Sequence, residues 1–166
     1  VQRKEQEKDY MNMIRQNERI IFKITSFYAN EEQSINDLYQ EVVINLWKAY
    51  PNFRGDCKQS TWIYRIALNT CVTFFRRNKN KLSYVDITMD LPDIPEDSDD
   101  IKTLYRLINK LGKIEKALVL LYLDEKPYKE IAEITGLSAT NVATKLGRIK
   151  EKLRKMERDR CNATCH

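Results

Sequence analysis

The sequence predicts an all-α protein of two small helical domains joined by a flexible acidic linker. Glycine and proline number only four each among 166 residues, fewer than a turn-rich sheet protein needs. Apolar residues recur every three or four positions through most of the chain, which is the spacing of one helical face. Between residues 83 and 100 this periodicity stops, and seven acidic residues and two prolines take its place.

We expect the first domain, residues 1–82, to hold three helices. Apolar periodicity predicts them at residues 5–28, 31–50 and 61–78, with a polar loop at 52–60 before the third. Each of the three carries one apolar face, so each has a side that can enter a common core. The face of the first helix comprises Tyr10, Met13, Ile14, Ile20, Ile21, Ile24 and Phe27.

The second of these helices carries its own start and stop residues. Ser34 and Asp37 offer a local cap near its beginning, because their side chains can accept hydrogen bonds from unpaired backbone N–H groups. Pro51 ends it, because the residue before a proline avoids the helical region.

We expect the second domain at residues 101–160, followed by a frayed tail at 161–166. Two helices are predicted near 101–111 and 113–123, and the stretch 128–150 has the pattern of a helix-turn-helix. Gly136 suits the turn because glycine reaches positive φ without steric cost, and Ser138 is a good N-cap for the next helix. That helix should bury Val142, Leu146, Ile149 and Leu153, with the small Ala132 at the helix crossing.

The polar face of the last helix has the residue types that contact phosphates and base edges. In a helix-turn-helix the N-terminal half of the second helix enters the major groove. An ordinary helical hairpin with a solvated polar face is the alternative interpretation. The candidate DNA-binding residues are Ser138, Thr140, Asn141, Thr144, Lys145 and Arg148.

Charge is distributed in three blocks. Residues 1–82 carry a net charge of +5, residues 83–100 carry −7, and residues 101–166 carry +7. The basic blocks favour a polyanionic partner. The acidic block between them does not favour such a partner. The longest apolar run, Ala117–Leu123, is far shorter than the ~18 residues that a membrane span needs. With no signal peptide at the start as given, we expect a cytoplasmic protein.

The residue inventory argues against an enzyme. The only histidine is His166, which removes most acid–base and nucleophile arrangements, and no phosphate-binding glycine motif is present. Cys71 lies on an apolar face and is expected in the core. Cys161, Cys165 and His166 form C-x-x-x-C-H, which falls short of the four ligands of a structural zinc. We therefore predict free thiols, no metal site and no cofactor; whether this tail binds metal or responds to redox stays open.

A second motif precedes the acidic segment. Residues 37–77 resemble region 2 of bacterial sigma factors of the extracytoplasmic-function type, in the sigma-70 family. The helix-turn-helix similarly looks like region 4 of the same family, and together the two motifs cover most of residues 10–155. Ala143 departs from the family pattern, because it lacks a charge often available there for phosphate. The residues matching region 2 are Asp37, Gln40, Glu41, Trp47, Phe53, Gly55, Thr61, Trp62, Ile66, Ala67, Asn69, Arg76 and Arg77.

The resemblance implies a promoter-specificity subunit of RNA polymerase that recognises the −10 and −35 elements and helps melt the −10 region. Its implied partners are core RNA polymerase, through the clamp coiled coil and the flap, promoter DNA and an anti-sigma factor. The acidic segment resembles the family's connector through the polymerase cleft, and a simple tether is the alternative. The implied polymerase-binding residues are Asp37, Gln40, Glu41, Asn45 and Trp47.

The resemblance also places the −10 contacts on the 53–60 loop and the helix after it. Flipped bases need a pocket with stacking and polar edges, for which the loop has an aromatic and several polar side chains. Trp62 can either stack on a base or anchor the core. The implied −10 residues are Phe53, Arg54, Asp56, Lys58, Gln59, Trp62, Arg65, Asn69, Arg76 and Arg77.

Two other functions remain as alternatives. One is an autonomous helix-turn-helix regulator that binds DNA as a dimer, although it would leave the region 2 motif and the linker without a role. The other is a sigma mimic that sequesters an anti-sigma factor without contacting promoters. Ala143 weakly favours the mimic, whereas the cations Arg76, Arg77, Lys145 and Arg148 argue against it.

Overall fold

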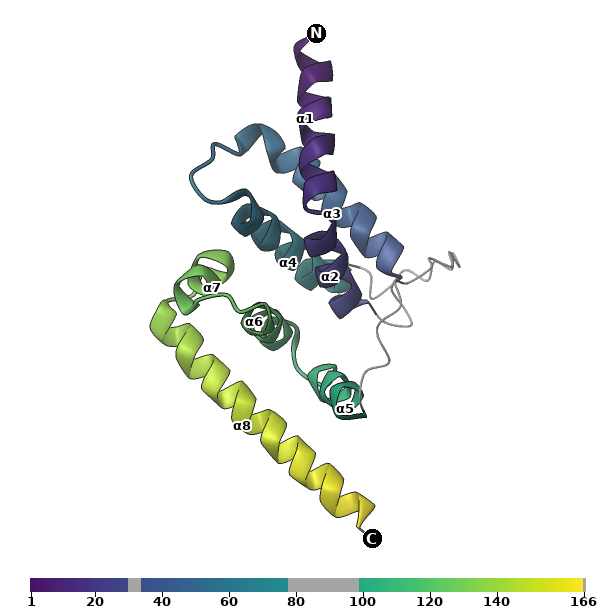
Figure 1. Ribbon diagram of the computed structural model, residues 1–166, viewed down its shortest axis with the longest axis vertical. Helices are drawn as coiled ribbons and strands as arrows, with labels where there is room; N and C mark the ends of the chain where they lie inside the picture. Colours follow the sequence, from purple (N-terminus) through teal and green to yellow (C-terminus); the bar gives the residue numbers. More distant parts are fainter. Residues whose placement is uncertain (30–33, 78–98, 166) are drawn as a thin grey trace. The chain divides into compact units, whose positions relative to one another are not determined.

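The computed structural model describes residues 1–29, 34–77 and 99–165, and the side chains of all of these except 75–77 and 101–102 (Figure 1). All regular structure in these ranges is helical, which confirms the predicted all-α class. The chain divides into two compact units, unit 1 (Val1–Met89) and unit 2 (Asp90–His166). Most of the predicted linker, residues 83–98, lies outside the described residues. None of the described helices combines the length and apolarity that a membrane crossing requires.

Unit 1 is a bundle around three mutually packed helices. Its elements are α1 (Gln2–Gln16), α2 (Glu18–Tyr28), α3 (Ile35–Ala49), the short 3-10 helix η1 (Tyr50–Asn52) and α4 (Gln59–Arg77). Helices α2, α3 and α4 contact one another pairwise, and α1 leads into α2 (Figure 1). The side chains with no more than 1% exposure at their centre are Ile21, Ile24, Thr25, Leu38, Val42, Leu46, Thr61, Ile63, Ala67 and Cys71.

The prediction of one helix over residues 5–28 is wrong, because the chain breaks at Asn17. The Asn17 side-chain Nδ2 donates to the Met13 carbonyl at 2.8 Å, and its backbone N–H donates to Ile14 and Met13. A short amide that bonds the preceding turn competes with helix continuation. Asn17 accordingly leaves the helical region, with φ −114° and ψ 14°. The described part of unit 1 therefore has four α-helices where three were expected.

Other boundaries of unit 1 follow from local capping. Ser34 is the N-cap of α3, and its side chain accepts a hydrogen bond from the Asp37 N–H at 3.2 Å, which confirms the predicted cap. The helix thus begins at Ile35, and residues 30–33 lie outside the described residues. Helix α4 begins at Gln59, so the polar loop ends two residues before its predicted limit.

Unit 2 is organised around one long helix. Its elements are α5 (Asp99–Ile108), α6 (Lys113–Leu123), α7 (Tyr128–Thr135) and α8 (Ala139–Thr164), and α8 contacts each of the other three. The Lys152 Nζ lies 3.1 Å from the Glu115 Oε1, which ties α8 to α6. The buried apolar residues are Leu107, Ile108, Leu111, Ala117, Leu118, Val119, Leu120, Leu121, Ile131, Ile134, Val142, Leu146 and Ile149.

Both ends of unit 2 differ from expectation. Helix α5 starts at Asp99, inside the predicted linker. Acidic residues in the first turn stabilise a helix because its N-terminus is the positive end of the helix dipole. Helix α8 continues to Thr164, so the prediction of a frayed tail from residue 161 is wrong for the described residues. The Cys165 N–H still donates to the Cys161 carbonyl at 3.2 Å, and the Thr164 hydroxyl donates to the Arg160 carbonyl. His166 lies outside the described residues.

Candidate functional site

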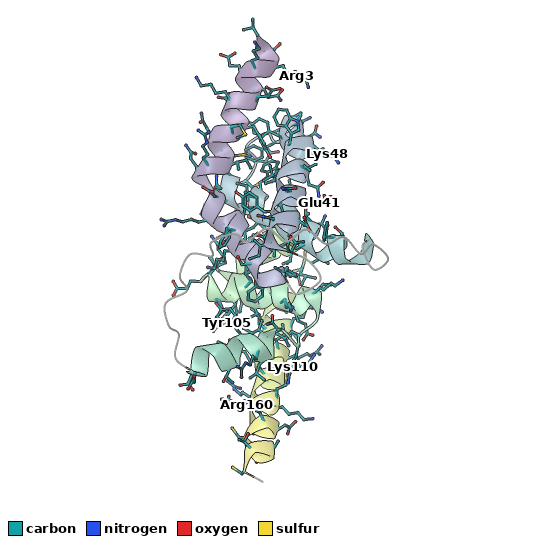
Figure 2. All side chains as sticks on the ribbon, turned by 90° about the vertical axis from the view of Figure 1, so that its right-hand side faces the viewer. Arg3, Glu41, Lys48, Tyr105, Lys110 and Arg160 are labelled. Atoms are coloured by element: carbon teal, nitrogen blue, oxygen red, sulfur yellow. The ribbon has the colours of Figure 1, made fainter. Side chains whose placement is uncertain are left out.

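The outward side of α3 presents part of the predicted polymerase-binding set. Gln40 is exposed, and Asp37 and Glu41 are partly exposed. Glu41 and Lys48 both lie along this helix (Figure 2). Sequence reasoning did not select Ile44 and Lys48, which lie one and two turns after Gln40. Ile44 is 46% exposed, so an apolar side chain stands in the middle of a polar face. The spacing of four residues from Gln40 to Ile44, which the sequence shows, could have indicated that the two side chains share one helical face.

Two members of the predicted set face other helices of unit 1. The Asn45 Nδ2 donates to the Thr70 Oγ1 of α4 at 3.1 Å. The Trp47 ring lies 4.9 Å from the ring of Tyr10 on α1, centroid to centroid, and stacks at 6.3 Å on Tyr50. Tyr10 in turn donates its hydroxyl to the Val43 carbonyl. Asn45 and Trp47 therefore position α3 against its neighbours, and only part of each side chain remains accessible.

A hollow of about 450 Å³ lies between α3 and α4. It brings Glu41 and Asn45, predicted for polymerase, beside Asn69, predicted for DNA. The two predicted surfaces are thus adjacent in unit 1, which their separation in sequence did not reveal. Its lining is Glu41, Asn45, Lys48, Ala49, Ile66, Asn69, Thr70, Thr73 and Phe74.

The loop between η1 and α4 presents its polar side chains to solvent. Arg54, Asp56, Lys58 and Gln59 are all exposed. Gly55 turns the chain at φ 77°, a conformation that side chains rarely adopt. The far end of the loop is held to the α1–α2 break, because Asn17 donates to the Gln59 Oε1 at 3.2 Å. The loop thus has a fixed base and an exposed polar rim.

Burial assigns Trp62 to the core beneath this loop. Its side chain is 8% exposed, and the Phe53 ring lies 4.7 Å from it at an interplanar angle of 33°. Of the two roles open for Trp62, core anchor or base-stacking platform, this geometry supports the anchor. Phe53, whose ring packs against it, is half-buried.

Helix α4 continues the predicted DNA-contacting set. Arg65 and Asn69 lie one turn apart and are exposed. Arg76 and Arg77 belong to the last turn of α4, but their side chains lie outside the described residues. Asn69 also lines the hollow between α3 and α4.

The helix-turn-helix forms as predicted. Gly136 ends α7 in the left-handed region at φ 77°. The Ser138 Oγ accepts a hydrogen bond from the Asn141 N–H at 3.1 Å and so caps α8. Ile131 and Ile134 of α7 are buried with Val142, Leu146 and Ile149 of α8. Ala132 and Leu153 are only half-buried.

Five of the six predicted recognition residues lie on α8, and the sixth, Ser138, is its cap. Thr140, Asn141, Thr144 and Arg148 are exposed, and Lys145 is half-buried. The Thr144 hydroxyl donates to the Thr140 carbonyl at 3.0 Å, so its oxygen keeps acceptor capacity towards a ligand. The Ser138 oxygen caps α8, so the candidate residues within the helix itself are the other five. The remaining set offers amide, hydroxyl and guanidinium groups suited to base edges and phosphates.

Of the ionisable groups with shifted pKa, Tyr10, Tyr28 and Cys71 are buried in the core of unit 1, whereas Tyr39 on α3 and Lys116 on α6 are half-buried. Burial raises the pKa of Tyr10 to about 12 and that of the Cys71 thiol to about 12, and it also raises the pKa of Tyr28. Burial lowers the pKa of Lys116 in unit 2. No group of three or more His, Cys, Asp or Glu suited to a metal occurs among the described residues.

Comparison with known proteins finds two family models along the chain. The model of sigma-70 region 2 matches residues 13–81, and that of sigma-70 region 4 matches residues 101–153. Similar proteins include the RNA polymerase sigma factor YlaC of Bacillus subtilis, 32% identical over 134 residues, covering 74% of this chain and 77% of that protein. The ECF RNA polymerase sigma factor SigW of Bacillus subtilis is 32% identical over 141 residues, covering 74% and 75%.

Among solved structures, the fold is similar to that of the sigma factor RpoE of Bartonella quintana, crystallised with the anti-sigma factor NepR. The TM-score is 0.70 at 15% sequence identity, covering 91% of this chain and 98% of that chain. At this identity the likeness concerns the fold.

Proposed function

Because this chain belongs to the sigma-70 family of RNA polymerase sigma factors, in its extracytoplasmic-function group, we propose that its two units divide promoter recognition between them. It is a promoter-specificity subunit that directs transcription initiation. It binds core RNA polymerase, recognises the −10 and −35 elements and helps melt the −10 region. This division of roles is supported by the order of the two family matches, in which region 2 covers unit 1 and region 4 covers unit 2.

Unit 2 is assigned the −35 element. The α8 face with Asn141, Thr144 and Arg148 enters the major groove, and Thr140 and Lys145 contact the flanking phosphates. Ser138 serves this surface as the cap that starts α8, which its hydrogen bond to Asn141 supports. This assignment extends over α5 to α8, from Asp99 onwards, and residues 83–98 are the connector to the first domain.

Unit 1 is assigned the −10 element, over residues 1–82. A flipped base is held at the exposed rim of the loop by Arg54, Asp56, Lys58 and Gln59, with Phe53 as the aromatic ring on which it stacks. Trp62 supports Phe53 from the core. Arg65 and Asn69 contact the DNA strand along α4. Arg76 and Arg77 are assigned to the same strand.

Helix α3 is assigned the polymerase clamp. Asp37, Gln40 and Glu41 make the direct polar contacts, with Ile44 as the apolar centre and Lys48 at the end. Asn45 and Trp47 hold the helix in place through Thr70 and Tyr10. Unit 2 also contacts the flap, and an anti-sigma factor covers the polymerase-binding surfaces when the protein is held inactive. Catalysis is carried out by the polymerase, so this chain is not an enzyme. It acts in the cytoplasm.

The test is run-off transcription with purified core polymerase on a library of promoter fragments, with and without this protein. We expect initiation at a subset of fragments, whose shared elements give the −10 and −35 sequences. Arg148→Ala should cost about 1–3 kcal/mol at the −35 element and relax its base preference. Arg158→Ala is the matched control, because this arginine lies on the same helix in a surface ion pair with Glu151.

Core binding separates the polymerase surface from the DNA surfaces. Gln40→Ala should weaken binding to core polymerase and leave promoter DNA preference unchanged. Gln16→Ala changes the same exposed residue type on α1 and should affect neither. A wild-type protein that neither binds core polymerase nor supports initiation would contradict the proposal.

A further inference from the structure

We propose that the last turn of α8 binds a two-coordinate thiophilic cation of the copper(I) class through the thiolates of Cys161 and Cys165. The inference does not rest on the promoter assignment above. The region 4 match ends at residue 153, so this turn lies beyond it. Neither thiol takes part in the packing of unit 2.

The helical tail is the observation that brings the two sulfurs together. Had the tail frayed, the thiols would sample all directions. In the structure α8 runs to Thr164, and the Cys165 N–H donates to the Cys161 carbonyl at 3.2 Å. The cysteines are therefore in i, i+4 register on one helical face, with Cβ atoms about 5–6 Å apart. Both are free and exposed.

This spacing favours a bridging cation over a disulfide. A disulfide needs Cβ atoms about 3.5–4.5 Å apart, closer than one regular helical turn provides. At a metal–thiolate distance like that of zinc, about 2.3 Å, two sulfurs span about 4.6 Å when the cation lies between them. The thiols can reach this separation by side-chain rotation while the turn stays helical. Binding exchanges two thiol protons for the cation, so affinity should rise with pH.

The number and kind of ligands select the cation. Among the described residues no group of three or more metal-binding side chains occurs, whereas a structural zinc site needs four ligands. Glu157 precedes Cys161 by one turn, but its carboxylate oxygen suits hard cations. A pair of thiolates matches a soft cation that accepts a low coordination number, and soft sulfur ligands select copper(I).

The site is separate from the recognition half of α8. Cys161 lies more than three turns beyond Arg148, about 20 Å along the axis at a rise of 1.5 Å per residue. Arg160 marks this end of the helix in Figure 2. The other two cysteines belong to unit 1, where Cys71 is buried and Cys57 is half-buried in the loop. Each of them can serve as a single-thiol control, and they are not a second pair one helical turn apart.

The test is an anaerobic titration of the reduced full-length chain with copper(I) in competition with bicinchoninate. We expect the chain to withdraw one copper(I) per molecule. Cys161→Ser and Cys165→Ser should each weaken this binding at least tenfold, while Cys57→Ser should leave it unchanged. X-ray absorption at the copper edge should report two sulfur neighbours.

A register variant distinguishes a paired site from mere thiol content. Cys165→Ala combined with Ala163→Cys keeps four cysteines but places the pair at i, i+2, on different sides of the helix. It should lose the binding while its circular dichroism stays that of the wild type. Retained binding in this variant, no withdrawal by the wild type, or one copper(I) shared by two chains would overturn the proposal.

Discussion

The two units build their functional surfaces in different ways. In unit 2 the proposed recognition residues lie along one face of a single helix, which a glycine turn and a serine cap within a few residues hold in place. In unit 1 the surface is assembled from two helices and a loop, with Asn45 and Asn69 meeting at one hollow. A surface on one helix follows from local spacing, whereas a surface shared between helices depends on how they pack.

The cores differ in the same sense. The described core of unit 2 is aliphatic, and its tyrosines Tyr105, Tyr122 and Tyr128 stand 48%, 41% and 38% exposed. Unit 1 buries Tyr10, Tyr28 and Trp62 together with threonines. Buried polar groups need partners, so unit 1 depends on specific hydrogen bonds where unit 2 depends on apolar contact.

The largest expected effect is a core truncation confined to unit 2. Leu146→Ala removes a side chain that is 1% exposed on α8. It should lower the free energy of unfolding of unit 2 by about 2–5 kcal/mol, through lost burial and a cavity. Amide hydrogen exchange, resolved by residue, would measure it. Leu153→Ala, at a half-buried position on the same face, should cost less, and equal losses in both units would contradict separate cores.

Alkaline pH should destabilise unit 1 specifically. Between pH 10 and about 12 the unfolded Tyr10 ionises while the folded phenol stays neutral, so stability present below pH 10 is lost through this window. The loss should be on the order of 2 kcal/mol, and Tyr10→Phe should reduce it. Lys116 acts oppositely in unit 2, since its lowered pKa makes stability rise with pH. Amide hydrogen exchange that increases first in unit 2 as pH rises would refute this contrast.

The bond between α3 and α4 should show as a coupling in unit 1. Asn45→Ala and Thr70→Ala each break the 3.1 Å hydrogen bond between their side chains. A double-mutant cycle from denaturant unfolding should give a coupling of about 0.5–1.5 kcal/mol. Losses that simply add would mean that the two helices do not rely on this bond.

The smallest effect is a gain on α8. A Cβ added at Gly147 meets nothing within 4 Å, and a glycine inside a helix costs about 0.5–1 kcal/mol relative to alanine. Gly147→Ala should therefore raise the melting temperature of unit 2 slightly. Gly136→Ala is the control with the opposite sign, because φ 77° strains any side chain there. A loss of stability from Gly147→Ala would show that this flank of α8 is not free.

The sequence by itself determined the all-α class, the family, the cap at Ser34 and the turn between α7 and α8. The class, the cap and the turn depend on residues within about four positions of one another, which is the range of helical periodicity and capping. The family follows from the order of two longer motifs along the chain. Asn17 breaks the first helix through a local hydrogen bond to Met13, which apolar periodicity does not show. Only the tertiary structure decided that Trp62 lies beneath Phe53 and that Asn45 turns towards Thr70. A polar or aromatic side chain at a helix boundary can face solvent or a neighbouring helix. The choice depends on partners such as Thr70, which is remote in sequence and close only after folding.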